Sequence, residues 1–171
     1  MFRIGIVGHR YLANSETVAF IAAQSLAVLK QARERHPEVV ALSAIAEGAD
    51  TLFAEAALTL AIPLEIVRPF TDYAADFETH EAKQRYEKLS VAARDELILP
   101  YESRSNGAYE AAMNWIVNRS DVLLAAWDGL AAEGAGGTGE AVKQAIKLNK
   151  HWLHLDVTDL SVKAHPSGSE T

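Results

Sequence analysis

The sequence contains no cysteine, and its 171 residues hold only 16 lysines and arginines against 23 aspartates and glutamates. The absence of cysteine excludes disulfides, thiolate metal ligands and a cysteine nucleophile. The formal net charge of −7 argues against a surface built to neutralise the phosphates of long nucleic acids. Nucleic acid is therefore a disfavoured partner.

Long apolar runs are also missing. No stretch reaches the ~18 residues that a membrane-spanning helix requires, and glycine interrupts the opening MFRIGIVGHR before a signal-peptide core forms. We therefore expect a cytoplasmic protein with no membrane partner. The length predicts one Rossmann-like domain over residues 1–158, followed by a polar, disordered tail at residues 159–171.

Several catalytic signatures are absent as well. The six histidines show no H-E-x-x-H spacing, and His151 and His154 would point to opposite faces of one strand, so no metal site is expected. G-x-S-x-G is missing, which removes the nucleophile elbow of serine hydrolases. G-K-[ST] is missing, which excludes a P-loop. No cofactor is identified from these motifs.

Short apolar runs alternate with longer amphipathic segments. Strands are predicted at residues 2–8, 39–46, 64–70, 96–100, 121–129 and 151–157. Helices are predicted at residues 16–35 with Ser15 as N-cap, 51–61, 108–120 and 139–149, with a mostly helical segment at 72–93. Strands that are apolar on both faces are typical of parallel sheets covered by helices. We predict a doubly wound α/β fold with a mainly parallel sheet of about six strands and helices on both faces.

Glycines and polar residues follow several of these strands. In open parallel sheets, ligands bind outside the carboxyl ends of the strands, so these turns are expected to lie together. The candidate ligand-binding residues are Gly8, His9, Arg10, Glu47, Gly48, Asp50, Asp128, Gly129, Gly136, Gly137 and Thr138.

The segment EGAGGTGEAV (residues 133–142) is the most glycine-rich of these turns. Gly136, Gly137 and Thr138 precede a predicted helix whose free N–H groups can bind an anion. The alternative is a flexible turn with Thr138 as N-cap. The other turns favour the phosphate site. GAGGTG matches G-x-G-x-x-G only formally, because several residues separate it from the preceding strand and one βα unit remains.

Each of the other candidates has a functional and a structural interpretation. Arg10 is either a phosphate partner or a solvent-facing arginine. A role for His9 in packing the turn is favoured over general acid–base catalysis, and a helix-capping role for Asp50 is favoured over ligand binding. Asp128 either binds a sugar or accepts loop N–H groups. Glu47 has no evident structural role.

The segments IGIVGHR, AIAEGADTLFAEAAL and DVLLAAWDG with GAGGTGEAV resemble the SLOG superfamily of Rossmann-like domains over about residues 2–155. This group includes Lonely-Guy-type nucleotide phosphoribohydrolases, once named lysine decarboxylases, molybdenum cofactor carrier proteins and DNA-processing protein A. Its members typically bind nucleotides or nucleotide derivatives, so the resemblance implies that ligand class. Related domains often pair, which makes a homodimer an expectation.

The resemblance implies ligand contacts at the matching positions, which are Gly8, Arg10, Gly48, Asp50, Gly136, Gly137 and Thr138. The phosphoribohydrolases carry P-G-G-x-G-T-x-x-E with a catalytic glutamate. Here the proline is missing and Ala141 stands at the glutamate position. Glu140 lies one residue earlier, which turns it about 100° around a helix. This departure disfavours hydrolysis of a base–ribose bond, and no cofactor-lysine motif supports decarboxylation.

Three functions therefore remain open. The first is a nucleotide-binding module of the sensor or carrier kind. The second is a nucleotide N-glycosidase that uses Glu47 or Glu140 as its carboxylate, and the third is binding of single-stranded DNA. The segment 72–93 is either a lid over the site or a solvated helix.

Overall fold

Seven strands form one sheet in the computed structural model, which describes residues 1–130 and 137–168. The strands are β1 (Phe2–Gly8), β2 (Val39–Ser43), β3 (Leu64–Arg68), β4 (Asp95–Ile98), β5 (Val122–Trp127), β6 (His151–Asp156) and β7 (Ser161–His165). Their order is β4-β3-β2-β1-β5-β6-β7, and every pairing is parallel except that of β6 with β7. The chain therefore builds one half of the sheet outward from β1, then returns to add β5 on the other side of β1.

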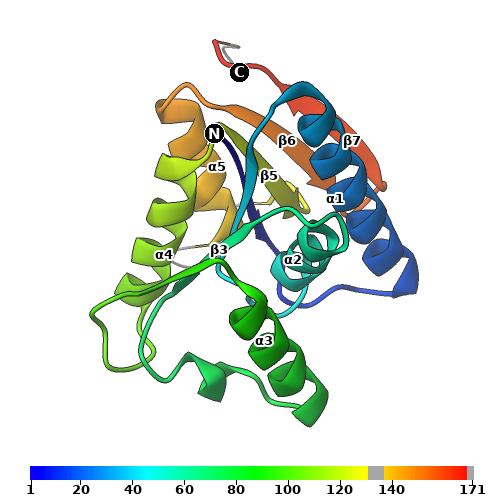
Figure 1. Cartoon of the computed structure of the whole chain (residues 1–171). Coiled ribbons are helices and arrows are strands. Elements are labelled where there is room, and N and C mark those ends of the chain that lie inside the picture. The colour runs from blue at the N-terminus through cyan, green and yellow to red at the C-terminus, as the bar shows by residue number, and fades with distance from the viewer. Residues whose placement is uncertain (131–136, 169–171) are drawn as a thin grey trace.

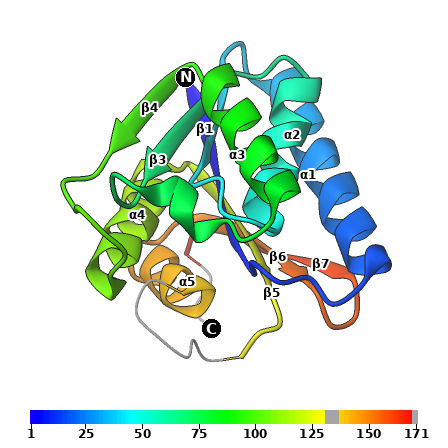
Figure 2. The same cartoon turned by 90° about the horizontal axis from the view of Figure 1, so that it is seen from below.

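Two helical layers cover this sheet. The helices are α1 (Ser15–Arg35), α2 (Ala49–Thr59), the short 3-10 helix η1 (Tyr73–Asp76), α3 (His80–Ala92), α4 (Asn106–Arg119) and α5 (Thr138–Lys147). Helices α1, α2 and α3 lie on one side of the sheet, and α4 and α5 lie on the other (Figures 1 and 2). This is the doubly wound Rossmann-like fold that the sequence predicts. No helix within the described residues is long and apolar enough to cross a membrane.

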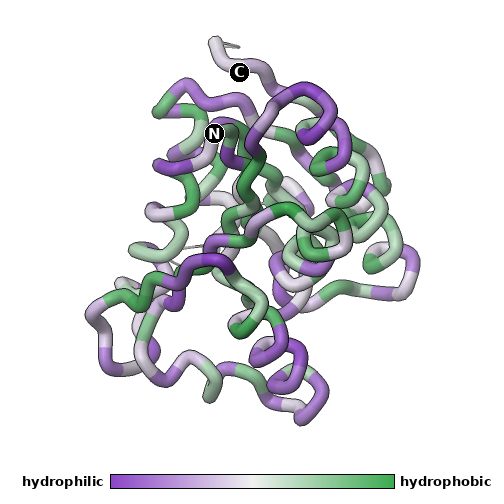
Figure 3. Tube along the Cα trace, viewed as in Figure 1, coloured by the Kyte–Doolittle hydropathy of each residue, from purple (hydrophilic) through white to green (hydrophobic). Residues whose placement is uncertain are grey.

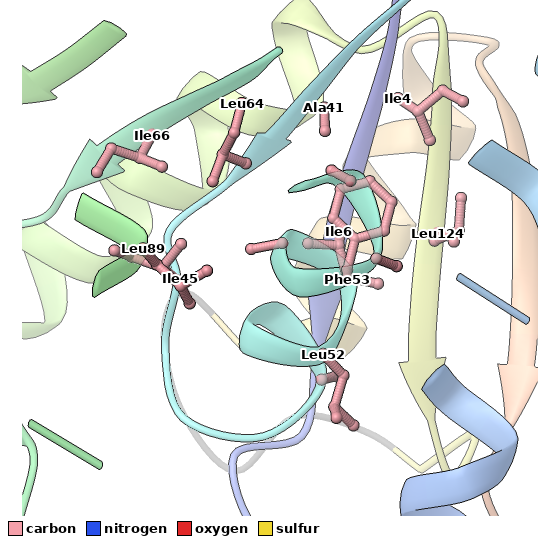
Figure 4. Close-up of a cluster of buried hydrophobic side chains, with 14 of the residues drawn as sticks. Ile4, Ile6, Ala41, Ile45, Leu52, Phe53, Leu64, Ile66, Leu89 and Leu124 are labelled. Carbon is pink, nitrogen blue, oxygen red and sulfur yellow. The ribbon is translucent and has the colours of Figure 1, made fainter. Parts of the chain in front are cut away.

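The sheet has a hydrophobic core on each face. On the face of α1 and α2, Phe53 packs against Ile6 and its strand neighbours (Figure 4). On the opposite face, Val117 of α4 and Leu123 of β5 belong to a second cluster. The central strands are buried on both faces for this reason, whereas α3 is coloured mostly hydrophilic in Figure 3.

Two local predictions are wrong. The N-cap of α1 is Asn14 rather than Ser15, because the Asn14 side chain accepts a hydrogen bond of 2.9 Å from the Thr17 N–H. The tail is not disordered throughout: Ser161–His165 form β7, which makes a seventh strand. The polar sequence suits an edge strand. Nζ of Lys163 donates a hydrogen bond of 2.8 Å to Oδ2 of Asp156 on the neighbouring strand, and the His165 ring stacks on Trp152. Residues 169–171 lie outside the described part of the chain.

Candidate functional site

A cavity of about 590 Å³ opens at the carboxyl ends of the strands, beside the point between β1 and β5 where the strand order reverses. Open α/β sheets bind their ligands at this position. The lining residues are Val7, Gly8, His9, Arg10, Ala44, Ala46, Asp50, Pro69, Tyr73, Tyr109, Ala112, Met113, Ile116, Trp127, Asp128, Leu130, Gly137, Thr138 and Gly139. The turns after four strands and the start of α5 thus converge on one space.

Most of the predicted site residues lie in this lining. Those that line the cavity are Gly8, His9, Arg10, Asp50, Asp128, Gly137 and Thr138. Those that do not are Glu47, Gly48, Gly129 and Glu140. Gly136 lies outside the described residues. The clustering of the turns was thus predictable, although not every residue within a turn faces the cavity.

Two of the predicted glycines are required by packing. A Cβ atom at Gly8 would lie 2.5 Å from the Cβ atom of Ala49 and 2.9 Å from that of Ala126. Gly48 has φ of 92°, and a Cβ atom there would collide with the carbonyl oxygens of His9 and Arg10. The first two turns therefore touch backbone to backbone, and the Ala49 N–H donates to the His9 carbonyl at 3.1 Å. This contact holds the first turn in place beside the cavity.

The start of α5 forms another wall. Gly137 is the N-cap, and no side chain caps this helix within the described part of the chain. The N–H groups of Glu140 and Ala141 both bond the Gly137 carbonyl at 3.1 Å, which leaves those of Thr138 and Gly139 without an intrahelical acceptor. Thr138 is the first helical residue, so its interpretation as the N-cap is wrong. The positive end of the helix dipole faces the cavity.

His9 and Asp128 tie the turns after β1 and β5 together. The Asp128 N–H donates to Nε2 of His9 at 3.3 Å, and the same nitrogen lies 3.4 Å from Oδ2 of Asp128. Oδ1 of Asp128 accepts from the Leu130 N–H at 3.0 Å. Both residues thus have the structural role considered for them, in packing the turn and holding the loop, while they also line the cavity.

Asp50 lies in the first turn of α2, but it does not cap that helix, since Gly48 is the N-cap. The backbone of Ala46 and Ala44, in the loop that leads to the helix, acts on its carboxylate and favours the charged form. The residue is 6% exposed. Burial raises the pKa of Asp50 to about 7, against the opposing influence of these backbone groups and of Arg10. A carboxyl group that changes charge near neutral pH therefore lines the cavity.

Arg10 is not solvent-facing, because it is paired with a residue that the sequence interpretation missed. Nη2 of Arg10 donates to Oδ2 of Asp76 at 3.1 Å, and the Tyr109 hydroxyl donates to the same oxygen. The Asp76 side chain is only 4% exposed, and Nε of Arg104 lies 3.9 Å from its other oxygen. Burial, and then the Asp76 carboxylate, raise the pKa of Tyr109 to about 12. The phenol therefore stays protonated and donates.

Asp76 and Tyr73 both come from η1, at the start of the segment for which we considered a lid or a solvated helix. Tyr73 is buried, lines the cavity and contacts Phe70 and Phe77 edge to face. The beginning of the segment is therefore a packed wall. The spacing of three aromatic residues in FTDYAADF (residues 70–77) is the signal that would have indicated burial.

The two candidate catalytic glutamates interact with basic side chains outside the cavity lining. Oε1 of Glu140 accepts from Nζ of Lys143 at 2.7 Å. The charge of Glu47, after the larger influence of Glu55, helps to raise the pKa of Arg85 on α3. Among the described residues, no group of three His, Cys, Asp or Glu side chains is arranged to hold a metal ion.

Comparison with known proteins finds likeness in structure only. No family model and no curated protein matches the sequence. DNA processing protein A from Streptococcus pneumoniae is similar in structure, with a TM-score of 0.63, 14% identity, and coverage of 90% of this chain and 50% of that one. This chain thus spans about half the length of that protein.

Two further structures share the fold. DNA processing protein A from Helicobacter pylori, which has a single-stranded DNA binding mode, gives a TM-score of 0.59 at 15% identity, covering 90% of this chain and 64% of that one. The Moco carrier protein from Chlamydomonas reinhardtii gives a TM-score of 0.55 at 16% identity. The match covers 91% of this chain and 76% of that one. These likenesses show that the chain has a Rossmann-like fold, as its sequence predicts.

Proposed function

We propose that the protein is a nucleotide-binding module whose ligand occupies the cavity at the carboxyl ends of β1 and β5. One observation carries the proposal: an uncapped, glycine-rich helix start and an apolar helix face line the same cavity. The first is formed by Gly137, Thr138 and Gly139, and the second by Met113 and Ile116 of α4 with their neighbours.

These two surfaces match the two halves of a nucleotide. Unpaired N–H groups at a helix N-terminus bind phosphate oxygens. Apolar side chains accept the faces of a flat base, while a few polar groups fix its orientation. Asp50 and Tyr109 also line the cavity and carry polar groups. In this proposal they contact the sugar or the edge of the base.

A thermal-shift screen tests the proposal. The purified protein is mixed with nucleoside monophosphates, nucleotide sugars, ADP-ribose and dinucleotides, and each mixture is then analysed by HPLC. Stabilisation by a compound recovered unchanged would support a binding module of the sensor or carrier kind. Recovery of free base and sugar phosphate would instead support an N-glycosidase. If no compound stabilises the protein, the proposal is wrong.

The carboxylates give little support to the enzyme alternative, because neither Glu47 nor Glu140 lines the cavity. Single-stranded DNA remains a competing ligand, because one structural neighbour binds it. The net charge of −7 weighs against that ligand. A gel shift at low salt separates the two, since a nucleotide-binding module is expected to leave the DNA unretained. The expected homodimer stays a prediction, which light scattering during gel filtration would test.

A further inference from the structure

The cavity carries little positive charge for a site that would hold a phosphate. Among its described lining residues, Arg10 is the one lysine or arginine, whereas Asp50 and Asp128 both contribute carboxyl groups. The N-terminus of α5 adds the equivalent of about half a positive charge. The charge of Arg10 is therefore decisive for how much negative charge the cavity can accept.

That charge is already offset by Asp76. The Asp76 carboxylate is nearly inaccessible to solvent, and Arg10 donates to it at 3.1 Å. The other two partners of the Asp76 carboxylate offset less of its negative charge. The Tyr109 hydroxyl is neutral, and Arg104 is 69% exposed and 3.9 Å away, so solvent screens its charge. Arg10 is thus the main counter-charge of Asp76, and the pair presents almost no net charge to a ligand.

We propose that Asp76 is a specificity-determining residue that limits the ligand to one phosphate group. This inference rests on the proposed nucleotide function. One phosphate is served by the α5 N-terminus, but a second would place further negative charge near the carboxylates of Asp128 and Asp76, with no unpaired lysine or arginine among the described lining residues to meet it. Asp76 acts on the ligand through Arg10 and does not contact it.

Isothermal titration of the full chain with AMP and ADP, and with inorganic phosphate and pyrophosphate, tests this inference. The wild type is expected to bind the compound with one phosphate more tightly in each pair. Asp76→Asn keeps an oxygen that can accept from Arg10 but removes the charge. It should shift the ratio of the two dissociation constants about tenfold in favour of ADP and pyrophosphate.

Glu65→Gln is the matched control, because Glu65 is another buried carboxylate held by arginines but lies outside the cavity lining. The control should leave the ratio unchanged. If Asp76 had a purely structural role, the substitution would weaken the binding of both ligands of each pair equally. An unchanged ratio of the two dissociation constants in a folded Asp76→Asn protein would therefore overturn the inference.

The wild type provides a test that does not depend on the folding of a variant. Its preference for AMP over ADP should be largest at low salt and decrease as salt screens the carboxylates. Equal or tighter binding of ADP at low salt would overturn the inference while leaving nucleotide binding intact. If the folded wild type binds none of the probes, the proposed function is wrong, and the inference fails with it.

Discussion

Two buried carboxylates in this protein, Asp76 and Glu65, are each held by two arginines. The Asp76 side chain, 4% exposed, contacts Arg10 and Arg104. The Glu65 side chain, 11% exposed, contacts Arg94 and lies 3.9 Å from Nε of Arg3. The chemistry of the two clusters is nearly the same.

Their places in the fold differ. Glu65 lies near the start of β3, and Arg3 near the start of β1, so this cluster is at the amino ends of the strands. Asp76 belongs to η1, behind the cavity at the carboxyl ends. Neither Glu65 nor its arginines line that cavity. A buried ion pair does not by itself indicate function; what distinguishes the Asp76 cluster is its position at the edge where open parallel sheets bind ligands.

The largest effect is expected from Gly137→Asp, which acts at the cavity without touching either cluster. A carboxylate at the N-cap of α5 should repel the phosphate and abolish nucleotide binding, a loss of at least about 100-fold. The melting temperature should be unchanged or slightly higher, because aspartate is a favourable N-cap. Titration and thermal unfolding measure the two quantities.

Gly107→Asp is the control for this substitution, because it adds the same charge outside the cavity lining, and a Cβ atom there would make only ordinary contacts with Tyr101, at 3.8 and 3.9 Å. It should leave binding unchanged. Undiminished binding by the Gly137→Asp protein would show that the α5 N-terminus does not hold the phosphate.

Next in size is the stability effect of removing each carboxylate. Asp76→Ala and Glu65→Ala should each lower the free energy of unfolding by about 2–3 kcal/mol, because arginines lose their counter-charge in partly buried positions. Urea unfolding measures this change. Only Asp76→Ala should also change the relative affinities for AMP and ADP. A similar change in Glu65→Ala would contradict the division between the two clusters.

The pH dependence of stability should reveal Asp50. Its pKa is about 7 in the folded protein, against 3.8 for an unperturbed aspartate. The folded state therefore holds the proton more tightly, so this residue makes the wild type lose stability as the pH rises from about 4 to about 7. The free energy of unfolding of the wild type should differ between pH 5 and pH 8, and Asp50→Asn should remove on the order of 2 kcal/mol of that difference.

Urea unfolding of both proteins at the two pH values measures this effect. An identical pH dependence in the wild type and in Asp50→Asn would mean that Asp50 is ionised throughout. Asp156 provides an internal contrast, because hydrogen bonds from Lys163 and then Thr158 lower its pKa. The contribution of Asp156 to the free energy of unfolding is therefore lost as the pH falls, whereas that of Asp50 is lost as the pH rises.

The smallest effect is expected from Arg104→Gln. The Arg104 side chain is largely exposed and lies 3.9 Å from Asp76, so its loss should change the free energy of unfolding by less than about 0.5 kcal/mol. Nucleotide affinity should change less than twofold. A large loss of affinity would show that Arg104, rather than Arg10, is the main counter-charge of the Asp76 cluster.

The fold was predictable because strand and helix periodicity is a local property. The run FRIGIVG corresponds to β1 from Phe2 to Gly8, and each predicted helix is present within a few residues. The exception, β7, has a polar sequence that becomes a strand only because β6 offers a free edge. Pairing with a distant edge leaves little local signal.

The site was predictable in its position and less so in its residues. Turns after parallel strands had to meet at one edge, which brought Arg10, Asp50 and Gly137 together. Asp76 was missed because it lies in a connecting segment, and only the folding of η1 against the β3 end makes it a partner of Arg10. Gly48 was assigned to the ligand because close backbone packing and ligand approach both require glycine.

The central claim is that a nucleotide phosphate binds at the start of α5. The most direct test is a nitrogen–proton correlation spectrum of the labelled protein during titration with AMP. The account predicts that the amide signals of Gly137, Thr138 and Gly139 shift most, with smaller shifts at Gly8 and Arg10, while those around Glu65 stay in place. Saturable shifts that leave the α5 amides unchanged would contradict it.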